Sequence, residues 1–345
     1  GLQGDDPTYL KTAACAKHFA CYSGPEDLRH EFDAVVSDKD LEESYFPAFQ
    51  ACVEEANVES VMSAYNRVNG FACSASPYLL QDVLRDKWGF EGHVVSDCWA
   101  IADIFKFHRL VDNPVDATAM SIEAGCDLNC GSCYGHAVDA VIADKLDEAK
   151  VDQALVRLFT TRMLLGLFEE EDQVSYNQLD WTLNDSPKHR EKNLEVALKV
   201  PVLLKNDGIL PLAKGGQETN GLSGPNARNI RALEGNYEGT ASRYWTVLDG
   251  LQDYLADTDT RLLFSEGCHL YKDRMSGLAE ANDRLSEVQA VCQASDVIIA
   301  CFGLDPGLEG EQGDQGNQFA SGDKPDLGLT GIQREILETI YSYNK

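Results

Sequence analysis

The chain has 345 residues, enough for two globular domains, and 43% of them are hydrophobic, which excludes a disordered chain. Fifty-seven acidic residues against 29 basic ones give a formal net charge of -28, which disfavours nucleic acid and anionic membranes as partners. No run approaches the roughly 18 to 20 apolar residues of a membrane span. The sequence therefore predicts a globular protein that binds neither nucleic acid nor membrane.

The first part of the chain, residues 1–168, alternates short apolar segments with longer segments of helical periodicity, which is typical of βα units around a parallel sheet. Strands are predicted over residues 13–19, 60–65 and 92–96, and helices over residues 38–57, 77–87, 114–124 and 152–167. In an (α/β) barrel the chemistry lies where strands run into their following loops. We therefore expect functional side chains directly after each strand.

A polar, acidic stretch over residues 169–190 has no sustained periodicity and is predicted to link two domains, 1–168 and 191–345. The second domain again alternates its elements: strands are predicted over residues 200–205 and 297–302, and helices over residues 189–198, 277–294 and from residue 330. A long glycine-rich loop follows the last strand, and loops of such length are commonly functional. The fold class is therefore α/β throughout.

Asp97 ends the third predicted strand, where its carboxylate would face the rim of a barrel. An aspartate at this point also suits the N-cap of a following helix, so position alone leaves both interpretations open. Lys17 and His18 close the first strand, and Tyr65 and Arg67 follow the second. Because the carboxyl ends of barrel strands meet at one face, these donors converge on Asp97 and suit the hydroxyl groups of a sugar.

The eleven cysteines are spread over two domains, and many lie in apolar runs, so most are predicted to be buried thiols. Cys126, Cys130 and Cys133 have a spacing that would hold a metal if a further thiolate or His136 joined them. The sequence favours buried thiols over that site, and no metal is expected.

Several segments occur in an order that resembles glycoside hydrolase family 3. They are Ala16-Lys17-His18-Phe19, Ser23-Gly24-Pro25-Glu26, Arg29-His30, Val61-Met62-Ser63-Ala64-Tyr65-Asn66-Arg67-Val68-Asn69-Gly70, Trp88-Gly89-Phe90-Glu91-Gly92, Val95-Ser96-Asp97-Cys98 and Ala124-Gly125-Cys126-Asp127-Leu128. The resemblance implies a partial (α/β)8 TIM-type barrel followed by an α/β sandwich. It also implies a fragment, since the chain starts without Met and an Asp and an Arg of the family site are expected upstream of it.

The resemblance also implies roles for single residues. Asp97 is the expected nucleophile, whose ionised state a nearby Lys17 ammonium would favour. The expected substrate-binding residues are Lys17, His18, Met62, Tyr65, Arg67 and Trp99.

A retaining glycosidase needs a second carboxyl about 5 to 5.5 Å from the nucleophile, and no second carboxylate stands out in the barrel segment. Resemblance to the β-xylosidases places this acid/base at Glu311, with Glu309 as the alternative. Composition alone would make both residues part of a solvated acidic loop. The chain also departs from the family pattern here, because Asp323-Lys324 replaces an Asp-Arg pair after an inserted glycine-rich stretch.

The function that the resemblance implies is hydrolysis of terminal β-D-xylose residues by an exo-β-xylosidase, with β-glucosidase as the alternative and α-L-arabinofuranosidase as a side activity. An N-acetylglucosaminidase is disfavoured because Ala20-Cys21-Tyr22 follows Phe19 where that branch has Pro-Gly-His-Gly. A nucleotide-binding module lacks its glycine fingerprint, and a non-catalytic carbohydrate-binding relic would have lost Asp97 or Glu311.

No cofactor is expected, and the expected partner is an oligosaccharide or an aryl or alkyl β-glycoside. The oligomeric state and the compartment stay open, with the periplasm or the exterior favoured by the resemblance.

Overall fold

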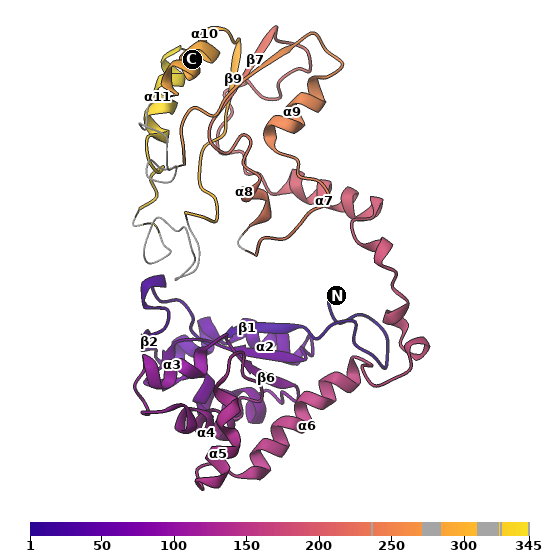
Figure 1. Cartoon of the computed structure of the whole chain (residues 1–345), viewed down its shortest axis with the longest axis vertical. Helices are drawn as coiled ribbons and strands as arrows, with labels where there is room; N and C mark the ends of the chain where they lie inside the picture. Colours follow the sequence, from indigo (N-terminus) through magenta and orange to yellow (C-terminus); the bar gives the residue numbers. More distant parts are fainter. Residues whose placement is uncertain (236, 271–283, 309–323, 325, 344–345) are drawn as a thin grey trace. The chain divides into compact units, whose positions relative to one another are not determined.

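The computed structural model describes residues 1–235, 237–270, 284–308, 324 and 326–343. The chain forms two compact units, Gly1–Leu183 and Asn184–Lys345 (Figure 1). Within the described residues no helix is both long and apolar enough to cross a membrane. Both units combine parallel strands with helices, which confirms the predicted α/β class.

Unit 1 is built on a parallel sheet in the order β1-β3-β6, formed by Cys15–Phe19, Ser60–Ser63 and His93–Ser96. All three strands were predicted from the sequence and are confirmed. A parallel bridge from Val95 to Leu128 continues the sheet beyond β6. Parallel neighbours in chain order, with helical crossovers between them, are the repeating arrangement of an (α/β) barrel.

Helices fill the connections between these strands (Figure 1). The helical segments of unit 1 are η1 Glu26–Leu28, α1 Asp38–Asp40, η2 Leu41–Tyr45, α2 Pro47–Glu54, η3 Cys73–Ala75, η4 Tyr78–Lys87, α3 Ala100–Lys106, α4 Pro114–Ala124, η5 Cys133–His136, α5 Ala137–Ile142, α6 Glu148–Leu164, η6 Glu171–Gln173, η7 Ser175–Gln178 and η8 Trp181–Leu183. Phe19, fully buried at the end of β1, packs against Phe46 and Phe49 of the first crossover and against Trp88. The strand end that carries the site is therefore fixed by an aromatic core.

A second, small sheet lies beside the strand ends of unit 1. It joins β2 (Asp33–Ala34) to β4 (Arg67–Val68) in parallel and β4 to β5 (Phe71–Ala72) in antiparallel pairing. Two-residue strands are too short to show a hydrophobic period, so the sequence did not predict them.

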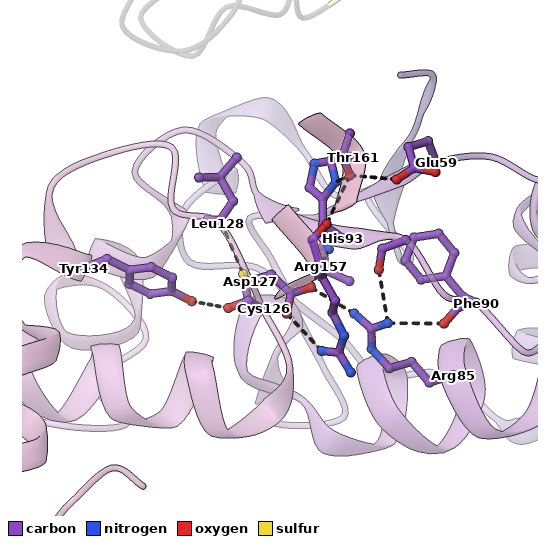
Figure 2. Close-up of polar contacts among 12 residues, drawn as sticks. Glu59, Arg85, Phe90, His93, Cys126, Asp127, Leu128, Tyr134, Arg157 and Thr161 are labelled. Atoms are coloured by element: carbon purple, nitrogen blue, oxygen red, sulfur yellow. Dashed lines mark hydrogen bonds and ion pairs between the residues drawn. The ribbon is translucent and has the colours of Figure 1, made fainter. Parts of the chain in front are cut away.

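A buried ion cluster ties β6 to the helices around it (Figure 2). Both oxygens of Asp127 are 2.9 Å from arginine nitrogens, Oδ2 from Arg85 on η4 and Oδ1 from Arg157 on α6. Oδ2 also accepts the backbone N–H of Val94 at 2.8 Å. Burial raises the pKa of Asp127 despite the two arginines, and it lowers the pKa of Arg85 to about 10. Because an unpaired charge is costly in the interior, the loss of any one of these partners would destabilise the fold.

A hydrogen-bond relay next to this cluster fixes α6 to the edge of the sheet (Figure 2). Thr161 Oγ1 lies 2.8 Å from His93 Nδ1 and donates to Glu59 Oε1 at 2.6 Å. Burial lowers the pKa of His93, which favours the neutral ring.

Unit 2 contains a parallel sheet in the order β8-β7-β9, formed by Arg261–Ser265, Thr219–Ser223 and Val297–Ala300. Its helices are α7 Pro187–Lys199, α8 Arg231–Glu234, α9 Val247–Leu255, α10 Leu285–Gln293 and α11 Gln333–Tyr343. The predicted strand 297–302 and the helices from 189 and 330 are confirmed. Residues 277–283 of the predicted helix 277–294 lie outside the described residues, and the described remainder forms α10.

The predicted buried strand over residues 200–205 is wrong. These residues belong to no strand and are exposed, with Leu204 at 92%. Their apolar run looks like a buried parallel strand in the sequence, but in the described part of the chain no strand pairs with it. A continuous apolar run has no periodicity, so the sequence alone does not show whether the run forms a strand or which strand it would pair with.

Candidate active site

The first strand of unit 1 ends in a bulge that decides which side chain reaches the site. Ala16 pairs with Val61 and Phe19 with Ser63, so β1 holds one more residue than β3 between these pairs. Cis peptide bonds precede His18 and Ala20. An extra residue in one strand re-aims the side chains around it. His18 is half-buried as a result, while Lys17 is exposed.

Asp97 follows the last residue of β6 and is 8% exposed. Its Oδ2 lies 3.3 Å from His18 Nε2, and its Oδ1 accepts the backbone N–H of Cys98 at 2.8 Å. The backbone N–H of Asp97 donates to the carbonyl of Ser63, at the end of the neighbouring strand, at 3.1 Å. These contacts hold the carboxylate at the carboxyl end of the sheet.

The alternative N-cap role of Asp97 is excluded by the backbone. Helix α3 has Trp99 as its N-cap residue, in the left-handed region with φ 68°, and no side chain caps this end. The Asp97 side chain instead bonds to Cys98 and pairs with His18. A carboxylate that lies at the carboxyl end of a strand and caps no helix is available to react with a substrate.

The position directly against Asp97 is occupied by His18, and the expectation that the Lys17 ammonium favours the ionised carboxylate stays a prediction. In the part of the chain that the structure describes, Lys17 makes no ion pair within 4.0 Å, and His18 pairs with Asp97 instead. The bulge in β1 is the physical reason, because it turns the lysine outward and the imidazole inward.

Aromatic and cationic side chains extend from His18 along the strand ends. The ring of His18 lies 4.9 Å from that of Tyr22, which is 6.3 Å from that of Tyr65. Arg29 places its guanidinium carbon 4.8 Å from the Tyr65 ring centroid, and its Nη1 lies 2.7 Å from Glu26 Oε1. We call His18, Tyr22, Arg29 and Tyr65 the subsite wall.

Arg29 and Tyr22 belong to motifs of the sequence, but neither residue was predicted to be part of the site. Arg29 is 8% exposed, which is unusual for an arginine and marks it as a residue held in place. The signal that could have identified it is its position in Arg29-His30, a short basic pair inside a loop.

The remaining predicted site residues lie at different distances from this wall. Met62 is half-buried on β3. Arg67, on β4, donates from Nη2 to the carbonyl of Glu31 at 3.1 Å and so belongs to the small sheet. Trp99 is 56% exposed and donates its backbone N–H to the carbonyl of Cys130 at 2.6 Å. Tyr65 joins the wall with His18, whereas these hydrogen bonds of Arg67 and Trp99 go to residues outside it.

The two acid/base candidates, Glu309 and Glu311, lie outside the described residues.

A disulfide joins Cys98, next to Asp97, to Cys130. Cys130 also donates its backbone N–H to Ser96 Oγ at 3.1 Å, so covalent and hydrogen bonds connect the two segments. The sequence did not predict this pairing. Six other cysteines are buried free thiols, as expected. Cys130 is unavailable for a cluster with Cys126 and Cys133, and among the described residues no group of side chains with metal-binding composition occurs.

We expect Cys98→Ser to lower kcat about tenfold, because the segment next to Asp97, the expected nucleophile, loses its crosslink and small displacements of reacting groups are costly. Reduction of the wild type with dithiothreitol, followed by thiol titration and an aryl glycoside assay, should give the same decrease. Reduction should not change the Cys98→Ser variant further. Cys15→Ser, at an exposed free cysteine, is the matched control and should keep the wild-type rate. An unchanged kcat after complete reduction would contradict the prediction.

Comparison with known proteins agrees with this architecture. Residues 1–161 match the glycosyl hydrolase family 3 N terminal domain, and residues 201–345 match the glycosyl hydrolase family 3 C-terminal domain. A probable exo-1,4-beta-xylosidase of Aspergillus terreus is 36% identical over 335 residues, covering 95% of this chain and 42% of that protein. A xylan 1,4-beta-xylosidase of Xylanibacter ruminicola is 37% identical over 288 residues, covering 82% and 33%.

Solved structures give the same result. A GH3 exo-beta-xylosidase (XlnD) in complex with a xylobiose aziridine activity-based probe matches with a TM-score of 0.87 at 29% identity, covering 99% of this chain and 42% of that one. A b-glucosidase from Erythrobacter marinus matches with a TM-score of 0.87 at 28% identity, covering 99% and 47%.

The parallel strands, the carboxylate at a strand end and the second parallel unit define a two-domain α/β protein with its candidate site on the first domain. The chain belongs to glycosyl hydrolase family 3. It consists of the family's (α/β)8-type barrel segment followed by its α/β sandwich segment. The chain spans about 42% of the length of the first curated relative that it matches.

Proposed function

We propose that the protein is a retaining exo-β-xylosidase that releases terminal β-D-xylose from xylo-oligosaccharides. The observation that carries this proposal is the position of Asp97, a buried carboxylate at the end of β6 that is paired with His18 and lies beside an aromatic and cationic wall. Aromatic faces and charged donors are suited to the C–H faces and hydroxyl groups of a sugar.

The reaction proceeds in two displacements. An oxygen of Asp97 bonds to the anomeric carbon while the bond to the leaving oxygen breaks, and that oxygen takes a proton from the acid/base residue. Water then attacks the glycosyl-enzyme, giving its proton to the same residue and releasing Asp97. The acid/base is assigned to Glu311 from sequence resemblance, with Glu309 as the alternative, and Lys17, Met62, Arg67 and Trp99 remain proposed contacts.

His18 has a defined part in this scheme. Its Nε2 lies 3.3 Å from Oδ2 of Asp97 and is proposed to hold the carboxylate in place for attack. The backbone N–H of Cys98 fixes the other oxygen, Oδ1.

The barrel part is assigned to residues 1–168 and the sandwich part to residues 191–345, with 169–190 between them. Ligands in the structures of relatives support a saccharide substrate, since one of them holds a xylobiose probe and others hold glucose or laminaribiose. A β-glucosidase is the second candidate, because several of these structures are β-glucosidases.

The test is the ratio of kcat/KM for aryl β-xyloside to that for aryl β-glucoside, measured on the complete gene product. The two sugars differ by one hydroxymethyl group, and a pocket that excludes this group discriminates by roughly 10- to 200-fold. We expect at least a tenfold preference for the xyloside. A reversed ratio would establish the β-glucosidase, and activity on neither substrate would refute the proposed function.

A further inference from the structure

A buried carboxylate lies one layer behind the subsite wall. Asp103, on α3, is 2% exposed, and its Oδ2 is 2.7 Å from Nδ1 of His30. Burial raises the pKa of Asp103, and the hydrogen bond to His30 opposes this shift. An ionised carboxylate only accepts hydrogen bonds, so with Asp103 ionised the His30 ring carries a proton on Nδ1 and is held in one orientation.

Aromatic contacts fix the same imidazole from its sides. The His30 ring lies 4.9 Å from that of Tyr65 at an interplanar angle of 77°, and 5.5 Å from that of Phe107 at 29°. A carboxylate thus holds one nitrogen of the imidazole, and two aromatic rings contact it as well. A side chain held in this way positions its neighbours more precisely than an aliphatic residue would, because its orientation is fixed by bonds as well as by contact.

His30 is next to Arg29 in the chain and contacts Tyr65 directly. Arg29 and Tyr65 in turn contact each other, with 4.8 Å between the guanidinium carbon and the ring centroid. The segment that carries Arg29 and His30 is therefore joined to α3 through one side-chain hydrogen bond, and α3 starts three residues after Asp97. The hydrogen bond between His30 and Asp103 therefore connects the subsite wall to the segment that carries Asp97.

We infer that His30 and Asp103 form a positioning pair, which holds Arg29 and Tyr65 in register with the nucleophile and so sets the affinity for the terminal sugar. This inference rests on the proposed function. Neither residue is assigned a contact with substrate. The pair acts through the wall, and its loss should weaken binding of the sugar in the ground state and in the transition state alike.

Three variants of the complete gene product test the pair. His30→Phe keeps an aromatic ring between Tyr65 and Phe107 but has no nitrogen for the hydrogen bond. Asp103→Leu puts an apolar side chain in the place of the carboxylate and removes the acceptor. Asp103→Asn keeps an acceptor oxygen and is the conservative variant.

The readout is the KM for the preferred aryl glycoside, which does not depend on the fraction of folded enzyme. We expect His30→Phe and Asp103→Leu each to raise KM about tenfold with kcat within about threefold of wild type, the pattern of lost uniform binding. Asp103→Asn should stay within about threefold of the wild-type KM. The double variant should match the single variants, since members of one pair are not additive.

An unchanged KM in the single variants, or a KM increase of about 100-fold in the double variant, would overturn the inference. If Asp103→Leu does not fold, His30→Phe and Asp103→Asn still decide the question. Thr161→Val is the structural control: it breaks a buried relay away from the wall and should lower the melting temperature without changing KM. An inactive wild type refutes the proposed function, whereas an active wild type with unchanged KM in the variants refutes only the pair.

Discussion

Replacing Asp97 with alanine is expected to lower kcat/KM for the preferred aryl glycoside by at least about 10⁴-fold. Without the proposed nucleophile the glycosyl-enzyme cannot form. The measurement is a steady-state assay on the complete gene product, with folding checked by circular dichroism.

The matched control is Asp139→Ala. Asp139 is also an aspartate of unit 1 that lies near a histidine, 3.4 Å from His136, but its side chain is 64% exposed and far from the strand ends in sequence. Its removal should leave kcat/KM unchanged. An Asp97→Ala enzyme that keeps more than a tenth of the wild-type rate would show that the nucleophile is another residue. Added azide should restore part of the lost rate on an activated aryl glycoside, because a small anion fits the space of the missing carboxylate.

Replacing Asp127 with alanine is expected to lower the free energy of unfolding of unit 1 by about 3 to 5 kcal/mol. The substitution removes the shared partner of two arginines, and Arg85 would keep a buried charge without its carboxylate. The backbone N–H of Val94, on β6, would also lose its acceptor. Urea unfolding followed by the fluorescence of the tryptophans in unit 1 measures the loss.

Glu42→Ala is the control for this experiment. Lys87 Nζ lies 2.6 Å from Glu42 Oε1, an ion pair as close as those of Asp127, but both side chains are nearly half exposed. Exposed pairs contribute below about 1 kcal/mol, so this variant should unfold close to the wild-type midpoint. If both variants lose a similar amount of free energy of unfolding, the contribution of these ion pairs does not depend on how deeply they are buried.

The core of unit 1 was predictable because its strands are apolar runs bounded by turns. β6 has this pattern in Val94-Val95, and the carboxylate that follows it marked the site. β7 shows the opposite case, since the segment Thr219–Ser223 is buried throughout and contains a single large apolar residue. A Cβ atom on Gly221 would come within 2.4 Å of Ile298 Cδ1, so only glycine fits at this position of the strand. The segment therefore lacks the apolar run by which a buried strand is predicted.

The details of the site depend on contacts that no local pattern records. The side chain that lies against Asp97 depends on a one-residue bulge in β1, which brings His18 to the carboxylate. The partner of Cys98 could not be chosen among ten other cysteines, because sequence alone does not determine connectivity. Strand ends were thus predictable, whereas the partners gathered around them were not.

The bridge between Cys98 and Cys130 also has a preparative consequence. Disulfides persist in oxidising compartments and are rare where glutathione and thioredoxin keep thiols reduced. Protein made in a reducing host would fold without the bond between Cys98 and Cys130, and later air oxidation would give a mixture of crosslinked and uncrosslinked molecules. Batches would then differ in their mean kcat, and a steady-state assay before and after complete oxidation would reveal this difference where a purity gel would not.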